Sequence, residues 1–513
     1  MKNIKYIVGA VLLLAGGSFM QSCTKLDVQP HSVIPENNFF TSPEQVEAAI
    51  APAYNSLTNI PSNDVFQLNE VSTDEMVVPT RGNDWYDGGK WQSLWQHTFR
   101  NDYDIFDNAW KALNNGITKC NSAISILSKL AQKPDNADQK IVELKVLRAY
   151  YLYMLMDMYG NVPVVSSFDT PPDKIVTVPR KDVYAFLESE LTTNVPLLTD
   201  VKDNTTYGHI NRWGGYMTLA KLYLNAQVYT GTPQWQKAHD VADLVIKSGK
   251  YTLQPNVLDN FIVSNEGSTE NIFVVPFDNI NIPGNGIELN TLNYNNQYTY
   301  NLTGQPYNGF SGPRAFYLKF ADNDARKKMW IVGQQYSSSG AALTDPATGL
   351  KVILSPYINE LSNPADSFKF AGVRSVKYAP QPGTHGDTNN DGVLFRYADA
   401  LMMKAEADMH LGDNAEALTL VNTIRNRSGL PNWTPAELTY ENFLDERGRE
   451  FAWEGWRRND LIRFEVATSV KSFSAARVPG KVQDADTHTY IFPIPAPQRV
   501  SNPKLTQNPG YGN

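Results

Sequence analysis

The chain has 513 residues, of which 42% are hydrophobic and 19% are charged, so it can bury a large core and does not belong to the intrinsically disordered class. Its formal charge of -8, with a pI near 5.5 and no long run of lysine or arginine, argues against a nucleic-acid partner. Beyond the first 23 residues Cys120 is the only cysteine, which excludes an intramolecular disulfide there.

The first residues have the pattern of an export signal that ends at a cysteine. Basic residues precede an apolar run from Ile7 to Ala15, which is too short for a membrane-spanning helix of ~20 apolar residues. Small residues then lead to Cys23, after which the chain becomes polar, as in bacterial lipoproteins. We predict a signal peptide over residues 1–22, lipidation at Cys23 and a tether over residues 23–40. The alternative is a secreted protein with an incidental cysteine.

The first loop-rich segment, residues 60–100, carries aromatic side chains between glycines. Asn83, Trp85, Tyr86 and Trp91 lie in a stretch whose flanking glycines argue against a regular element. Exposed aromatic rings can stack on the CH faces of sugars while nearby amides and carboxylates bond the hydroxyls. We therefore predict these four residues as ligand contacts, although a loop tryptophan can also fold back into the core.

Three neighbours of this cluster have simpler explanations. Asp74 is a further candidate ligand contact, but capping of a helix explains it equally well. Trp95 and Phe99 follow Trp91 at helical spacing, so we expect them in the core.

Two pairs of helices are predicted in the first half of the chain, over residues 109–159 and 213–249. Both have amphipathic segments separated by a polar break, and the second has the small residues of a helical repeat at its crossing. Each segment would form one antiparallel helical hairpin.

Residues 256–392 form the second loop-rich segment. They contain one predicted buried strand, Asn271–Val275, and stretches rich in Asn, Gly and Tyr that are too polar for a core. Loops of this length are uncommon unless they are functional. Amide and aromatic side chains alternate at Tyr294, Asn296 and Tyr298, and packing does not readily explain the alternation. We predict these three residues as a second group of ligand contacts.

Near the end of this segment, Gly386–Gly392 resembles the first half of a calcium-binding loop. The position that needs a bidentate glutamate is Ala398, so the motif is incomplete. We expect a polar turn before the next helix, and neither a bound metal ion nor a cofactor.

Two further helix pairs are predicted over residues 396–429 and 440–466. In the first, Leu401, Ala405 and Asp408 occupy the fourth, eighth and eleventh positions of a 34-residue tetratricopeptide-like repeat. Because stacked hairpins need at least three units to bury their faces, about four pairs make a credible scaffold. The predicted fold is mainly α, with a tetratricopeptide-like scaffold, an irregular loop-rich ligand-binding region and a few short strands.

The last helix pair carries three glutamates on one helical face, Glu446, Glu450 and Glu454. Paired carboxylates hydrolyse glycosides when they are held about 5–10 Å apart across a sugar. Arginines in the same segment would instead neutralise these carboxylates and keep them ionised; they are Arg447, Arg449, Arg457 and Arg458. We predict a structural ion-pair network and no catalytic residues.

Several segments match one family pattern in order along the chain. Residues 147–153 and 159–163 are similar to an LRA-YY helix that ends at YG-VP, and residues 445–463 to the pattern ER--EF-FEG-R--DLIR. The ending Phe492–Pro495 and the cysteine at the end of the signal also match. Over essentially its whole length the chain resembles the SusD/RagB family. The resemblance implies one SusD-like domain over residues 41–513.

The resemblance also implies a function. Such proteins are lipid-anchored at the outer membrane, face the cell exterior, and deliver oligosaccharides to a SusC-like TonB-dependent transporter without acting as enzymes. The 11% content of aromatic residues, beside many amides, suits a sugar ligand. Two alternatives remain: an adaptor or assembly lipoprotein whose repeats bind proteins, and a surface glycoside hydrolase that uses the Glu446–Glu454 face.

Overall fold

The computed structural model describes residues 40–358, 360–474 and 487–512. Cys23, the predicted signal peptide and tether residues 23–39 lie outside the described residues. The α-helices are α3 (Pro43–Asn55), α4 (Asp64–Val71), α5 (Lys90–Gln96), α6 (Asp104–Ser128), α7 (Ala137–Tyr159), α8 (Arg180–Asn194), α9 (Arg212–Leu224), α10 (Ala226–Thr230), α11 (Trp235–Lys247), α12 (Ile287–Thr291), α13 (Asn296–Tyr300), α14 (Arg314–Tyr317), α15 (Tyr397–Leu411), α16 (Asn414–Arg427), α17 (Tyr440–Phe451), α18 (Arg457–Ala467) and α19 (Ala496–Ser501). The strands are β1 (Thr80–Arg81), β2 (Asn271–Val275), β3 (Trp330–Ile331), β4 (Gly333–Gln334), β5 (Ile353–Leu354), β6 (Ser362–Asn363), β7 (Arg374–Ser375) and β8 (Gly392–Arg396).

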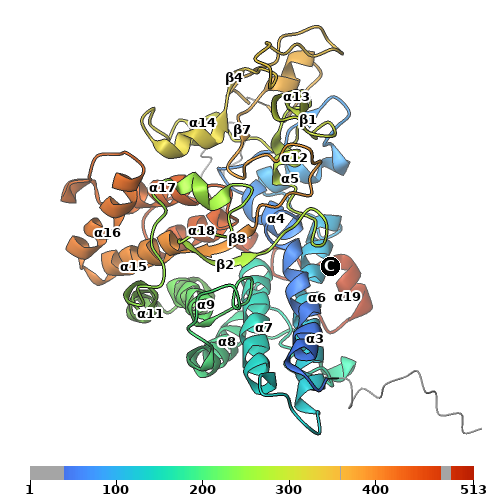
Figure 1. Cartoon of the computed structure of the whole chain (residues 1–513), viewed down its shortest axis with the longest axis vertical. Coiled ribbons are helices and arrows are strands. Elements are labelled where there is room, and N and C mark those ends of the chain that lie inside the picture. The colour runs from blue at the N-terminus through green and yellow to red at the C-terminus, as the bar shows by residue number, and fades with distance from the viewer. Residues whose placement is uncertain (1–39, 359, 475–486, 513) are drawn as a thin grey trace, which may run out of the picture.

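The long helices pack against one another in a continuous series. α6 packs on α7, α7 on α8, α8 on α9, α9 on α11, α11 on α15 and α15 on α16, while α17 packs on α18. In Figure 1 the earlier helices of the series form the lower part of the molecule, and loops with α12, α13, β1 and β4 form its upper end. The four predicted helix pairs and the mainly α fold are confirmed. Helices α8 and α10 were not predicted.

Close helix packing depends on small residues at the crossings. A Cβ atom on Gly116 of α6 would lie 2.5 Å from the ring of Tyr151 in α7, so only glycine allows this approach. The Tyr151 hydroxyl in turn donates to the backbone oxygen of Ala53 in α3 at 2.8 Å. Tyr150, Tyr151 and Tyr153 are all fully buried. The tyrosine-rich segment of α7 therefore lies at the centre of the helical layer.

The strands form small two-stranded sheets. The longest joins β2 and β8 antiparallel, with Phe273 opposite Phe395, Val274 opposite Val393 and shifts of register on either side of Phe273. Both strands are buried along their full length. The predicted strand Asn271–Val275 is confirmed, whereas its partner β8 was not predicted. The other sheets pair β1 with β6, β3 with β7, and β4 with β5.

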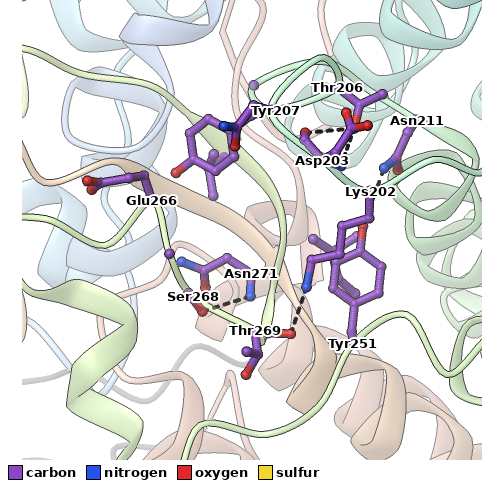
Figure 2. A pocket seen from close by; sticks show the side chains of 15 residues that line it. Lys202, Asp203, Thr206, Tyr207, Asn211, Tyr251, Glu266, Ser268, Thr269 and Asn271 are labelled. Atoms are coloured by element: carbon purple, nitrogen blue, oxygen red, sulfur yellow. Dashed lines mark hydrogen bonds between the residues drawn. The ribbon is translucent and has the colours of Figure 1, made fainter.

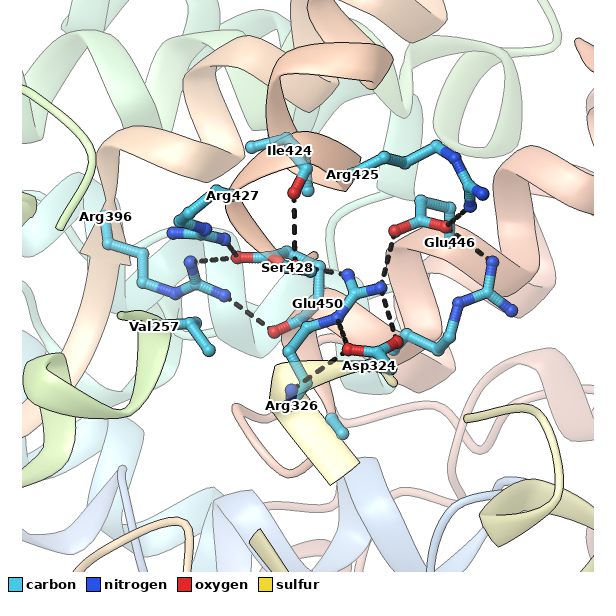
Figure 3. A network of polar contacts seen from close by, with 12 residues as sticks. Val257, Asp324, Arg326, Arg396, Ile424, Arg425, Arg427, Ser428, Glu446 and Glu450 are labelled. Carbon is cyan, nitrogen blue, oxygen red and sulfur yellow. Dashed lines mark hydrogen bonds and ion pairs between the residues drawn. The ribbon is translucent and has the colours of Figure 1, made fainter. Parts of the chain in front are cut away.

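A buried network of ion pairs surrounds the glutamates of α17 (Figure 3). Glu450 pairs with Arg396 at 2.5 Å, with Arg326 at 3.2 Å and with Arg427. Glu446 pairs with Arg326 at 2.8 Å and with two further arginines. Burial alone would raise the pKa of Glu446, but the surrounding guanidinium groups outweigh it and lower the pKa to about 2. The predicted ion-pair network is confirmed, but most of its arginines differ from the predicted ones. Of those named from the sequence, Arg449 pairs with Glu446, whereas Arg447 pairs with Asp460 and Arg457 with Asp74. Arg458 donates to the backbone oxygen of Thr489 at 2.6 Å.

A second buried network joins the N-terminal part of the chain to the turn between α17 and α18. Arg457 donates to both carboxylate oxygens of Asp74, at 2.7 and 2.8 Å. Glu75 accepts from the backbone N–H of Trp453 at 3.0 Å, and Glu70 accepts from that of Gly455 at 2.6 Å. Burial raises the pKa of Glu75 well above its usual range, and the nearby Arg457 guanidinium opposes this shift.

Within the described ranges, none of the helices combines the length and the apolar composition that crossing a bilayer requires.

Candidate functional site

Loops at the upper end of the molecule bring together most of the aromatic residues predicted as ligand contacts (Figure 1). The Tyr294 hydroxyl donates to the Asp84 carboxylate, which ties the α13 segment to the loop after β1. The Trp85 indole N–H donates to the backbone oxygen of Tyr307 at 2.7 Å. These contacts join three loops into one surface. We call it the aromatic face and define it by Asn83, Asp84, Trp85, Tyr86, Tyr294, Tyr298, Asn301 and Tyr307.

Trp85 is held firmly within this face. Its backbone has a φ of 64°, a left-handed conformation that is uncommon for a bulky residue and marks strained sites. Its ring lies 5.5 Å from that of Phe310 and 5.7 Å from that of Trp91. On another side it contacts Gly309 so closely that a Cβ atom there would overlap the indole. Trp85 is half-buried, with its orientation fixed before any ligand arrives.

Three tyrosine rings of the face are exposed to solvent. The exposed fractions are 57% for Tyr86, 51% for Tyr298 and 46% for Tyr307. Tyr298 lies in α13, which ends at Asn301 in a left-handed conformation with φ 52°. Asn301 accepts from the Ser338 hydroxyl at 2.8 Å, so its amide is anchored beside the tyrosine. Exposed rings beside fixed amide and carboxylate groups form a surface suited to polyhydroxylated ligands.

The remaining predicted contacts lie below this surface. Trp91 is buried in α5, where its indole N–H donates to Asp87 at 2.6 Å. Asn296 is buried and donates to the side chain of Gln335 at 3.1 Å. Asp74 is buried against Arg457, and this ion pair replaces the capping role considered for it. Trp91 and Asn296 support the face from within, whereas Asp74 belongs to the buried network with α18, so we exclude all three from the set of surface contacts.

Trp95 and Phe99 are buried, as predicted.

Two buried arginines, Arg81 and Arg374, lie behind the aromatic face and were not predicted from the sequence. Arg81 donates to the backbone oxygens of Phe368 at 2.6 Å and Ala371 at 2.8 Å. Arg374 donates to the Asn308 side chain at 2.7 Å and to the same Ala371 oxygen at 2.8 Å. No carboxylate of the described residues pairs with either arginine, and burial lowers the pKa of Arg81 to about 9. Isolated arginines in polar loops give no sequence signal that distinguishes them from solvated ones.

The incomplete calcium motif serves as a connector between loops. Asn389 accepts from the backbone N–H of Asn279 at 2.9 Å, and Asn390 donates to the oxygen of Phe261 at 2.9 Å. Asp391 accepts from the N–H of Phe277 at 2.9 Å. Among residues 40–358, 360–474 and 487–512, no group of three or more His, Cys, Asp or Glu side chains is placed to hold a metal ion.

A single methyl group at position 309 is expected to disturb the aromatic face. In Gly309→Ala the new Cβ would overlap the Trp85 indole, and such overpacking typically costs about 1–3 kcal/mol. Denaturant unfolding should show this loss, and tryptophan emission should shift to the red. The shift should be absent when the same change is made in a Trp85→Phe background. Gly267→Ala is the matched control, because its Cβ would meet open space. Equal stability of the two alanine variants would contradict the prediction.

Comparisons with known proteins agree with this architecture. A family model described as "SusD family" matches residues 227–511, and one described as "Starch-binding associating with outer membrane" matches residues 26–224. SusD-like protein P38 of Formosa agariphila is 25% identical over 551 residues and covers 100% of both chains. The starch-binding protein SusD of Bacteroides thetaiotaomicron is 26% identical over 415 residues, or 72% of each chain.

A solved structure has the same fold. The surface glycan-binding protein A of Bacteroides thetaiotaomicron, in complex with laminarihexaose, superposes with a TM-score of 0.69. The match is 20% identical and covers 91% of this chain and 100% of that chain. Since the SusD family model alone spans more than half of the sequence, the chain belongs to the SusD family.

Proposed function

We propose that this protein captures oligosaccharides on the aromatic face and delivers them to a SusC-like TonB-dependent transporter. The observation that carries the proposal is the set of exposed rings Tyr86, Tyr298 and Tyr307 beside the fixed Trp85 and Asn301. Starch binding and laminarihexaose binding in two related proteins support a glycan as the ligand. In this proposal a lipidated Cys23 anchors the protein at the outer membrane, and residues 23–40 form a tether below a single domain.

We infer binding without catalysis, and the placement of the glutamates considered for hydrolysis supports this. Glu446 and Glu450 are buried and paired with arginines, so neither can reach a sugar at the surface. At the face itself, polar contacts to a sugar exchange for contacts to water at little net gain. We therefore expect dissociation constants in the micromolar to millimolar range, about -8 to -4 kcal/mol. Weak binding suits a protein that must release its cargo.

The test is a glycan panel measured by calorimetry with residues 24–513. The probes are laminarihexaose, maltohexaose and other defined oligosaccharides, with product analysis to detect hydrolysis. We expect at least one glycan to bind without turnover, and Trp85→Ala and Tyr298→Ala each to weaken binding about tenfold or more, equivalent to about 1.4 kcal/mol. Phe168→Ala, which removes an exposed ring from the helical part of the chain, is the control and should bind normally. Binding that survives both face variants would place the ligand elsewhere, and turnover would overturn the proposal.

A further inference from the structure

A separate polar pocket lies beside β2 and the start of α9, in the helical part of the molecule and away from the aromatic face at its upper end (Figure 1). The loop of residues 202–211 and the segment of residues 266–274 form its walls, and its volume is about 190 Å³. Pockets for drug-sized ligands span about 300–1,000 Å³. This pocket therefore has room for a ligand no larger than one monosaccharide.

One wall supplies a hydrogen-bond donor over an aromatic ring. The Lys202 ammonium donates to the backbone oxygens of Thr269 at 3.1 Å and Lys250 at 3.3 Å. It lies 4.2 Å from the centre of the Tyr251 ring. An ammonium group has three N–H donors, so one remains for a ligand. Burial lowers the pKa of Lys202, and no carboxylate of the described residues forms an ion pair with it.

The opposite side supplies an acceptor, Glu266, which Figure 2 shows across the pocket from Lys202. Glu266 is exposed at the rim, and its carboxylate has no hydrogen bond or ion pair within the described part of the chain. Asn271 lines the pocket with only 7% of its surface exposed, and its side-chain oxygen has no partner among the described residues. That oxygen is itself closed to solvent, so Asn271 forms part of the wall without offering an acceptor to a ligand. The ring of Tyr207 completes this side, while its hydroxyl is occupied by Asp391.

We propose that this pocket is a second carbohydrate site that takes one neutral sugar residue. Hydroxyl groups both donate and accept, so a single sugar can accept from Lys202 and donate to Glu266. The rings of Tyr207 and Tyr251 offer apolar surface to its CH groups. The lining carries two carboxylates, Asp203 and Glu266, which disfavour an anionic ligand, and one ammonium, Lys202, which disfavours a cationic one, so a neutral polyol fits best.

Saturation-transfer NMR and calorimetry with the methyl glycosides of glucose, galactose, mannose and xylose test this site. We expect one or more of them to bind the chain of residues 24–513. Lys202→Met and Glu266→Gln, which keep side-chain length, should each weaken that binding about tenfold. Lys181→Met and Glu441→Gln change exposed residues outside the pocket and should have no effect. The Trp85→Ala and Tyr298→Ala variants should bind the methyl glycosides normally, whatever their effect on oligosaccharides.

Each contrary result has a definite meaning. If no methyl glycoside binds, or if Lys202→Met and Glu266→Gln bind as the parent does, the pocket is not a sugar site. Tighter binding of methyl glucuronide than of methyl glucoside would overturn the assignment to a neutral sugar. Loss of binding in Tyr298→Ala with retention in Lys202→Met would place the monosaccharide on the aromatic face. The oligosaccharide measurements with Trp85→Ala report on the proposed function independently.

Discussion

Replacement of Glu450 by alanine is expected to lower the free energy of unfolding by about 3–5 kcal/mol, the range typical of a broken buried ion pair. The side chain is buried between Arg326, Arg396 and Arg427, and its removal leaves these guanidinium groups with fewer counter-charges. Urea or guanidinium unfolding of residues 24–513 measures the loss. Glu441→Ala is the control, because Glu441 is exposed on the same helix and has no ion pair in the described ranges. A difference below about 1 kcal/mol between the two variants would contradict the expectation, since exposed pairs contribute that little.

The same network gives the stability an acid dependence with a definite sign. The pKa of Glu446 is about 2 in the folded protein against an ordinary value of 4.5, so the unfolded chain takes up the proton first as pH falls. The contribution of Glu446 to the free energy of unfolding is complete above pH 4.5 and is lost progressively between pH 4.5 and about 2. The pKa of Glu450 is also well below its usual value, because the opposing effect of burial is outweighed by its arginine partners. The Glu450→Ala variant should therefore lose less stability than the parent over this range.

Arg457→Met is expected to destabilise the protein by a similar amount, about 3–5 kcal/mol. Arg457 is fully buried, donates twice to Asp74 and lies 3.5 Å from Glu75. Gly448 permits this position, since a Cβ atom there would lie 2.7 Å from the guanidinium. Without the arginine, Asp74 loses the guanidinium that donates to both of its carboxylate oxygens. Thermal and denaturant unfolding at pH 7 should both show the loss.

A double-mutant cycle separates the ion pair from general packing. Asp74→Asn removes the carboxylate charge that Arg457 faces, so the double variant should be more stable than the sum of the two single changes predicts. We expect a coupling of about 1–3 kcal/mol, within the range measured for residues in direct contact. Strict additivity would show that Arg457 contributes through volume alone.

The helical scaffold was predictable because its signals are local. Periodic apolar residues and small residues at crossings mark α6, α7, α9, α11 and α15 to α18 without knowledge of their partners. The alternation of glutamate and arginine in α17 likewise indicated ion pairs before any contact was known. Strand β8 was missed because Gly392–Arg396 is a strand only through its pairing with β2, more than a hundred residues earlier.

The aromatic face was predictable in part. Trp85 and Trp91 are six residues apart in one polar stretch, and the sequence does not indicate which of the two is buried. In the structure Gly89 adopts a left-handed conformation with φ 83° and starts α5 directly after it, which turns Trp91 inward. Arg81 and Arg374 were beyond prediction because most of their partners are backbone oxygens of residues 368–372, and the side chains that they also reach, Ser311 and Asn308, are distant in the sequence.

The contact between Asp74 and Arg457 also constrains the order in which the protein can fold. The two residues are 383 positions apart, and the buried Lys221 likewise depends on Asp399, at 2.8 Å. During synthesis, which runs from the N-terminus, the first half of the chain therefore carries charges whose partners do not yet exist. The boundary near residue 225 between the two family matches is thus not a boundary between folding units. The core can close only after α18 has been made, so a chain that stops short of it leaves its interior charges open to water and to proteases.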